Sequence, residues 1–126
     1  MAVIYHGKRV QGKAIVTYQR TEMNRKLGEK PLRHVDYHSD DFEWGYPGSG
    51  PADLALSILA HHLGETWVNG KYLRKMRITQ ETPLCWKLHQ DFKRDVIAIL
   101  DRTEWELTNK QVHDWLMSQV PKETTV

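Results

Sequence analysis

Hydrophobic and polar residues alternate in three segments near the start of the chain. Residues 3–6 and 13–19 each show the two-residue period that is typical of a half-buried β-strand. The period returns at residues 33–38, where Val35 and Tyr37 fall on one side of the chain and polar residues on the other. Together these segments predict a small antiparallel sheet of three strands.

The most apolar segment runs from about Pro51 to Leu63. Gly50 precedes it and Gly64 follows it, in positions that favour the start and the end of a helix. Apolar side chains cover most of its circumference, so we predict a central helix that is covered on several sides. One narrow polar stripe remains, and we expect it to face solvent rather than to form a catalytic triad: Asp53, Ser57 and His61.

Two further helices follow, one amphipathic over about residues 84–100 and one near the C-terminus. The first carries the single cysteine of the chain, Cys85, between two apolar neighbours, which predicts a packed thiol rather than a nucleophile. The second opens with Thr108 and Gln111, the T-x-x-Q pattern of a capping box, and stops before Pro121. The sheet and the three helices predict an α+β fold.

A hairpin signal lies between the first two helices. Asn69 and Gly70 separate short apolar pairs, and both residue types tolerate the positive φ angles of a two-residue turn. We therefore expect an extra β-ribbon within residues 65–83. A length of 126 residues is typical of one domain, so we predict a single α+β domain over residues 1–121 and a short polar tail at 122–126.

The composition indicates the compartment in which the protein acts, but it does not indicate a function. The single cysteine suits a reducing compartment, and no apolar run approaches the length that spans a bilayer. The N-terminus lacks the basic start and the apolar stretch of a secretory leader. We therefore expect a cytoplasmic protein with no membrane partner. The formal charge of +2 is too small to indicate nucleic acid by itself.

Basic residues gather in two places along the chain. One cluster surrounds Tyr72, and cations beside an aromatic ring can hold phosphates while the ring stacks on a base: Lys71, Arg74, Lys75 and Arg77. The second cluster lies in the polar segment after the second predicted strand: Arg20, Arg25, Lys26 and Lys30. The first cluster is a candidate nucleic-acid contact, and a solvated surface is the alternative for both.

A glycine-rich loop, residues 44–50, leads into the central helix. Its spacing Gly45-x-x-Gly48-x-Gly50 ends at a helix N-terminus, where free backbone N–H groups and the positive helix end can bind an anion. It matches neither G-x-G-x-x-G nor a P-loop, and Ser49 lacks the G-x-S-x-G pattern of a nucleophile elbow. The alternative is that the two aromatic residues of the loop pack over the core while the glycines only permit the turn.

Alternate residues of the third predicted strand combine imidazole and carboxylate groups: His34, Asp36 and His38. Such side chains point the same way from a strand and suit zinc or another divalent ion, with Asp40, Asp41, His61 or His62 as a fourth ligand. No H-E-x-x-H or paired-cysteine spacing supports this, and an exposed polar sheet face explains the pattern as well. We therefore predict no metal site and no cofactor.

Several short motifs resemble a family of small uncharacterised proteins, described as a domain of unknown function. They are His38-Ser39, Phe42-x-Trp44-Gly45-Tyr46, Gly48-Ser49-Gly50-Pro51-Ala52 and Leu54-Ala55-Leu56, and matching motifs continue to Trp115-Leu116. The resemblance implies a setting on phages, plasmids or other mobile elements, and it implies no activity. Two residues depart from the family pattern: Pro47, where a small residue is expected, and Asp53, where glutamine is expected.

We expect a non-enzymatic binding or regulatory protein, of phage or mobile-element origin, that acts on a macromolecular partner, first of all a protein. The contact residues would come from the glycine-rich loop: Trp44, Tyr46, Gly48, Ser49 and Gly50. A different class of function places a nucleotide-like or other phosphorylated small molecule at the same loop, where it is sequestered or hydrolysed. A third class is nucleic-acid binding through residues 71–77.

Overall fold

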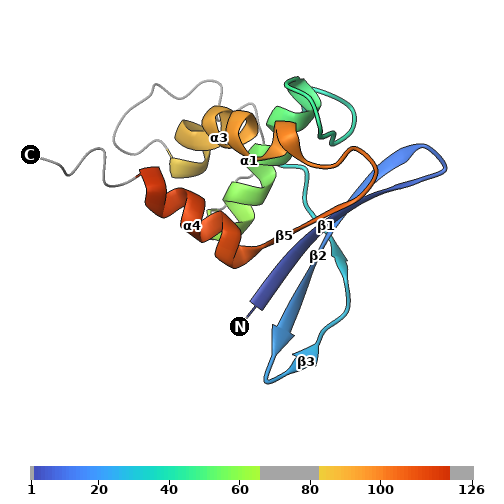
Figure 1. Ribbon diagram of the computed structural model, residues 1–126, viewed down its shortest axis with the longest axis vertical. Coiled ribbons are helices and arrows are strands. Elements are labelled where there is room, and N and C mark those ends of the chain that lie inside the picture. The colour runs from blue at the N-terminus through green and yellow to red at the C-terminus, as the bar shows by residue number, and fades with distance from the viewer. Residues whose placement is uncertain (1, 66–82, 120–126) are drawn as a thin grey trace, which may run out of the picture.

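The computed structural model describes residues 2–65 and 83–119 of the chain. Its helices gather on one side of an antiparallel sheet, and the end of the sheet formed by two of the strands projects away from them (Figure 1). The strands are β1 (Ala2–Val10), β2 (Lys13–Glu22), β3 (Arg25–Lys26), β4 (Lys30–Pro31) and β5 (Trp105–Thr108). The helices are α1 (Ser49–Leu63), α3 (Leu84–Asp95), α4 (Asn109–Gln119) and the short 3-10 helix η1 (Ile97–Ile99). The predicted α+β class is confirmed.

β1 is central to the sheet, whose order is β3-β2-β1-β5, with β4 also paired to β2. The register between β1 and β2 runs from Ala2 opposite Thr21 to Val10 opposite Lys13. Alternate side chains of both strands are buried toward the helices, as the two-residue period of the sequence predicted. The first two predicted strands are therefore confirmed, and both are longer than their apolar patterns indicated.

The third predicted strand, residues 33–38, is wrong. The structure has no strand there, and the adjacent residues Val35 and Asp36 are both buried, which an alternating strand does not allow. The backbone N–H of Val35 donates to the hydroxyl of Ser57 on α1 at 3.1 Å instead of to a neighbouring strand. The other edge of β1 is occupied by β5, and the sheet has five strands rather than three.

α1 lies at the centre of the core, as predicted, but most of its polar stripe does not face solvent. Every residue from Gly50 to Ala60 is buried, and Asp53 and Ser57 are each only 1% exposed. The helix begins at Ser49, earlier than predicted, and ends at Leu63, where Gly64 caps it in the left-handed conformation at φ 67°. The prediction of a solvent-facing stripe is wrong because other groups of the chain bind these polar side chains.

α3 is shorter than predicted, since it ends at Asp95 and η1 replaces the last residues of the predicted helix. Cys85 is fully buried, and burial raises the pKa of its thiol, so the predicted packed thiol is confirmed. The capping box of α4 is also confirmed. The N–H of Gln111 donates to Thr108 Oγ1 at 3.1 Å, and the N–H of Thr108 donates to Gln111 Oε1 at 2.8 Å.

Three predictions lie outside the described residues: the ribbon at Asn69 and Gly70, the basic cluster at residues 71–77 and the polar tail at 122–126. They stay predictions. Within the two described ranges, no helix has the length and the apolar character that are needed to cross a bilayer.

Candidate functional site

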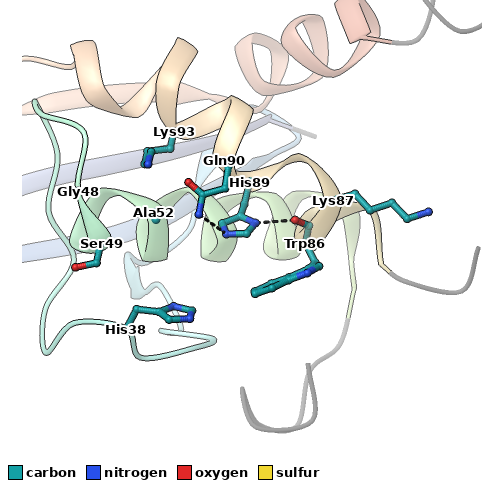
Figure 2. Close-up of a pocket in the computed structure, with 9 residues that line it drawn as sticks. All are labelled: His38, Gly48, Ser49, Ala52, Trp86, Lys87, His89, Gln90 and Lys93. Atoms are coloured by element: carbon teal, nitrogen blue, oxygen red, sulfur yellow. Dashed lines mark hydrogen bonds between the residues drawn. The ribbon is translucent and has the colours of Figure 1, made fainter. Parts of the chain in front are cut away.

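A cavity of about 440 Å³ lies between the first turn of α1 and one face of α3 (Figure 2). Pockets for small ligands measure roughly 300 to 1,000 Å³, so its size suits such a ligand. Three separate segments of the chain line it: His38, Gly48, Ser49, Ala52, Trp86, Lys87, His89, Gln90 and Lys93. The fold thus places part of the glycine-rich loop at a pocket.

The first turn of α1 begins at this pocket with backbone N–H groups that have no partner within the helix. Gly48 is the N-cap without a side-chain hydrogen bond, and its carbonyl oxygen accepts the N–H of Ala52 at 3.0 Å. The N–H groups of Ser49 and Gly50 precede this first intrahelical bond, and Pro51 has no N–H to offer. The partial positive charge of the helix end therefore favours an anion.

α3 adds two cationic side chains to the pocket, Lys87 and Lys93. In the part of the chain that the structure describes, neither lysine forms an ion pair, and no lining residue of the pocket is acidic. Figure 2 shows Lys93 on the same side of the pocket as Gly48 and Ser49. The charge of the lining residues therefore suits a negatively charged ligand better than a positively charged one.

Trp86 and His89 form an uncharged aromatic wall of the pocket. Their ring centroids lie 4.7 Å apart at an interplanar angle of 30°. His89 Nδ1 donates to the carbonyl oxygen of Trp86 at 2.6 Å, which leaves Nε2 to accept from the amide of Gln90 at 3.2 Å. Burial lowers the pKa of His89 and outweighs the opposing hydrogen bond to Trp86, so this imidazole is neutral at pH 7. Such a wall suits a planar group of a ligand.

His38 is fixed at the pocket by Asp53, a buried carboxylate of α1. His38 Nδ1 lies 2.9 Å from Asp53 Oδ1, and the His38 backbone N–H donates to Oδ2 at 2.9 Å. The same Oδ2 accepts from His34 Nε2 at 2.9 Å and from the backbone N–H of Ser39 at 3.1 Å. Asp53 therefore ties the first half of the loop between β4 and α1 to the helix, and it holds the orientation of the His38 ring.

The charge of Asp53 is stabilised by these donors rather than by solvent. Burial on its own raises the pKa of Asp53, but the hydrogen bonds from His34, from His38 and from two backbone N–H groups outweigh it and lower the pKa below its ordinary value. A second carboxylate, Asp36, lies 3.7 Å from the other ring nitrogen of His38. His38 therefore lies between two carboxylates, and it contributes shape to the pocket more than positive charge.

Sequence reasoning missed this hydrogen-bond centre. It placed His34, Asp36 and His38 on an exposed strand face, whereas the two histidines bind Asp53 from a loop. Across residues 2–65 and 83–119, no group of three or more His, Cys, Asp or Glu side chains has an arrangement that could hold a metal ion. The available signal was a lone carboxylate at Asp53, within the most apolar stretch of the chain.

The loop residues that we predicted as a contact surface do not all lie at the pocket. Trp44 is fully buried, and its indole N–H donates to the carbonyl oxygen of Arg102 at 3.1 Å, so it supports the loop from beneath. Gly48 and Ser49 line the pocket. Tyr46 is 41% exposed, and its ring packs where a side chain at Gly48 would otherwise lie.

Gly50 is buried and does not line the pocket. A Cβ at this position would lie 2.7 Å from the Cβ of Glu43 and 3.3 Å from the carbonyl oxygen of Asp41. Any side chain there would displace the loop, so its small size is required for packing. A substitution of Gly50 would change the stability of the loop whether or not a ligand binds.

Comparison with known proteins gives a family and no function. No curated protein and no solved structure matches the chain. One family model matches residues 5–79, more than half of the 126 residues, and its description is Family of unknown function (DUF6166). This range contains β2, the glycine-rich loop, Asp53 and all of α1. The chain therefore belongs to this family of unknown function, which confirms the predicted class of family.

Proposed function

We propose that the protein binds a small phosphorylated molecule that carries a planar ring, such as a nucleotide, in the pocket between α1 and α3. The observation that supports this most directly is the charge of the pocket. Lys93 and the start of α1 both offer positive charge, and no lining residue is acidic. A phosphate group supplies the negative charge and the acceptor oxygens that a lysine and free backbone N–H groups bind.

Two ends of the pocket suit the two parts of such a ligand. Ser49 brings a hydroxyl and a backbone N–H to the end near Lys93, which is the expected position of the phosphate. Figure 2 shows Lys93 and Trp86 on either side of Ala52. The ring would lie against Trp86 and His89, where stacking needs no charge.

The proposal is one of binding without a reaction. His38 is held by a carboxylate in the manner of a catalytic histidine, but Asp36 lies 3.7 Å from its Nε2. A carboxylate at that distance repels a phosphate at the nitrogen that would have to act on it. The proposal therefore remains a non-enzymatic one. It favours a small ligand over a protein partner, because Trp44, the largest residue of the predicted contact surface, is buried and cannot touch a partner.

The phage or mobile-element setting, the hallmark motif and a protein partner stay predictions of the sequence. In such a setting the protein would sense or sequester a phosphorylated molecule in the cytoplasm of its host. This role needs no cofactor and no metal ion, because the positive charge comes from the chain itself.

Lys93→Met is expected to abolish most of the stabilisation by ligand. A ligand that binds only the folded state stabilises it by about 2.7 kcal/mol at a hundredfold excess over its Kd. Thermal unfolding with inorganic phosphate, AMP, ADP or cyclic AMP should therefore raise the midpoint of the wild type with at least one nucleotide. Methionine keeps most of the length of the side chain and removes its charge.

Lys110→Met is the matched control, since Lys110 lies on α4 outside the pocket, with an 82% exposed side chain that pairs with Asp114 at 2.8 Å. It should leave the ligand-induced rise in the midpoint unchanged. No rise in the wild type with any of the four ligands, or an equal loss in both variants, would contradict the proposal.

A further inference from the structure

A positively charged ribbon of the sheet takes no part in the pocket. We call residues 20–30 the arm: the outer end of β2, the turn at Met23 and Asn24, and the chain through β3 to the start of β4. Figure 1 shows the β2–β3 end projecting away from the three helices. The arm contains four cationic and two acidic residues, and all four cations are exposed.

The charge of these cations is not neutralised within the fold. Some exposed cations elsewhere do have acidic partners, such as Arg9 with Glu43 at 2.9 Å and Lys110 with Asp114 at 2.8 Å. Over the described part of the chain, none of the four cations of the arm forms an ion pair: Arg20, Arg25, Lys26 and Lys30. The arm therefore presents a local positive potential to solvent.

The tip of the arm exposes an apolar side chain to solvent. Met23 and Asn24 form the turn with φ angles of 49° and 63°, a conformation that favours Asn, Asp or Gly at both positions. Methionine has no local hydrogen bond to offset this conformation, and its side chain is 94% exposed. A strained turn residue with an exposed apolar side chain is better explained by a contact with a partner than by the stability of the hairpin.

We propose that the arm binds duplex DNA, with its cations on the phosphate backbones and Met23 in a groove. The major groove of B-form DNA is about 12 Å wide and admits a two-stranded β-ribbon. Apolar side chains that include methionine also enter DNA at base steps. The narrow major groove of A-form RNA excludes a ribbon, and one methionine gives too little apolar area to hold a membrane surface. This inference is independent of the ligand pocket.

Binding is measured by fluorescence anisotropy of a labelled, mixed-sequence DNA duplex of about 20 base pairs, between about 50 and 200 mM salt. The logarithm of the affinity should fall linearly with the logarithm of the salt concentration. Lys26→Gln should reduce the slope by about one. The combined variant Arg25→Gln, Lys26→Gln and Lys30→Gln should weaken binding at low salt by at least about tenfold.

Met23→Asn separates binding from folding. Asparagine favours the left-handed turn, so this variant should unfold at a higher temperature than the wild type. It should nevertheless bind DNA severalfold more weakly, with an unchanged salt slope, because a groove contact is lost and no charge is removed. Lys110→Gln removes one positive charge on α4 and should change neither the affinity nor the slope.

Four results would overturn the inference. They are no binding to the duplex at the lowest salt, an equal loss in Lys110→Gln and Lys26→Gln, an unchanged affinity in Met23→Asn, and equal or tighter binding to an RNA duplex of the same sequence or to anionic vesicles. The first two exclude a DNA contact at the arm, the third excludes a role for Met23, and the fourth excludes duplex DNA as the preferred partner.

Discussion

Replacement of Asp53 by asparagine is expected to lower the free energy of unfolding by about 3 to 5 kcal/mol. The change removes a buried charge that accepts hydrogen bonds from His34, His38 and Ser39, and it turns an amide NH₂ group toward the same donors. A buried hydrogen-bond donor that loses its acceptor lowers the free energy of unfolding, because water cannot replace the lost partner. Urea unfolding, followed by tryptophan fluorescence, measures the difference from wild type.

Asp40→Asn is the matched control, because Asp40 is exposed in the same loop. Its free energy of unfolding should stay within about 0.5 kcal/mol of the wild-type value. The pH dependence gives a second check. The pKa of Asp53 is lower in the folded state, so its stabilisation is present above the unfolded pKa, near about 4, and is lost as the pH falls through the folded pKa. A difference between wild type and Asp53→Asn that did not shrink below about pH 4 would show that its charge is not the cause.

Trp44→Ala is expected to lower the free energy of unfolding by about 3 to 5 kcal/mol. The indole is fully buried, meets Trp105 edge-on at a centroid distance of 5.6 Å and lies 4.5 Å beneath the guanidinium of Arg9. Its N–H also donates to the carbonyl oxygen of Arg102. The truncation therefore leaves a large cavity and removes a hydrogen bond. The midpoint of thermal unfolding is the direct measurement.

Tyr46→Ala is the comparison within the same loop, since Tyr46 is 41% exposed. It should cost less than about 1 kcal/mol. Equal effects of the two substitutions would contradict the burial that the structure assigns to Trp44. A loss of ligand binding in Trp44→Ala reports on the stability of the loop, and not on a contact made by the indole.

Local patterns predicted much of the fold. The two-residue period identified β1 and β2, and Gly64 identified the end of α1, because these signals depend on residues that are close in the sequence. The capping box at Thr108 and the packed thiol of Cys85 were predicted for the same reason. Each of these features depends on only a few residues that are neighbours in the sequence.

The errors arose where residues far apart in the sequence decide the structure. Residues 33–38 alternate as a strand does, but their polar groups bind Asp53 and Ser57 on α1. β5 is only four residues long, and it pairs with β1 where Gly7 has no side chain to overlap the ring of Trp105. Neither fact is visible in a local pattern.

Part of the lining of the candidate pocket was predicted. The position of the glycine-rich loop before a helix led us to predict an anion site there, and two of its residues, Gly48 and Ser49, line the pocket. Lys93 and Trp86 were not identified, because they lie on α3 and reach the loop only when α1 packs against α3. A helix start shows where an anion can bind, whereas the rest of a pocket depends on tertiary packing.

The central claim is tested most directly by a titration of the ¹⁵N-labelled protein with AMP, followed by two-dimensional NMR. We expect saturable shifts of the backbone N–H signals of Gly48, Ser49 and Lys93 and of the indole N–H of Trp86. The indole N–H of Trp44, which is buried and bonded to a carbonyl oxygen, should shift little. Shifts that are absent at millimolar AMP, or that fall only on residues outside the pocket, would contradict a phosphorylated-ligand site between α1 and α3.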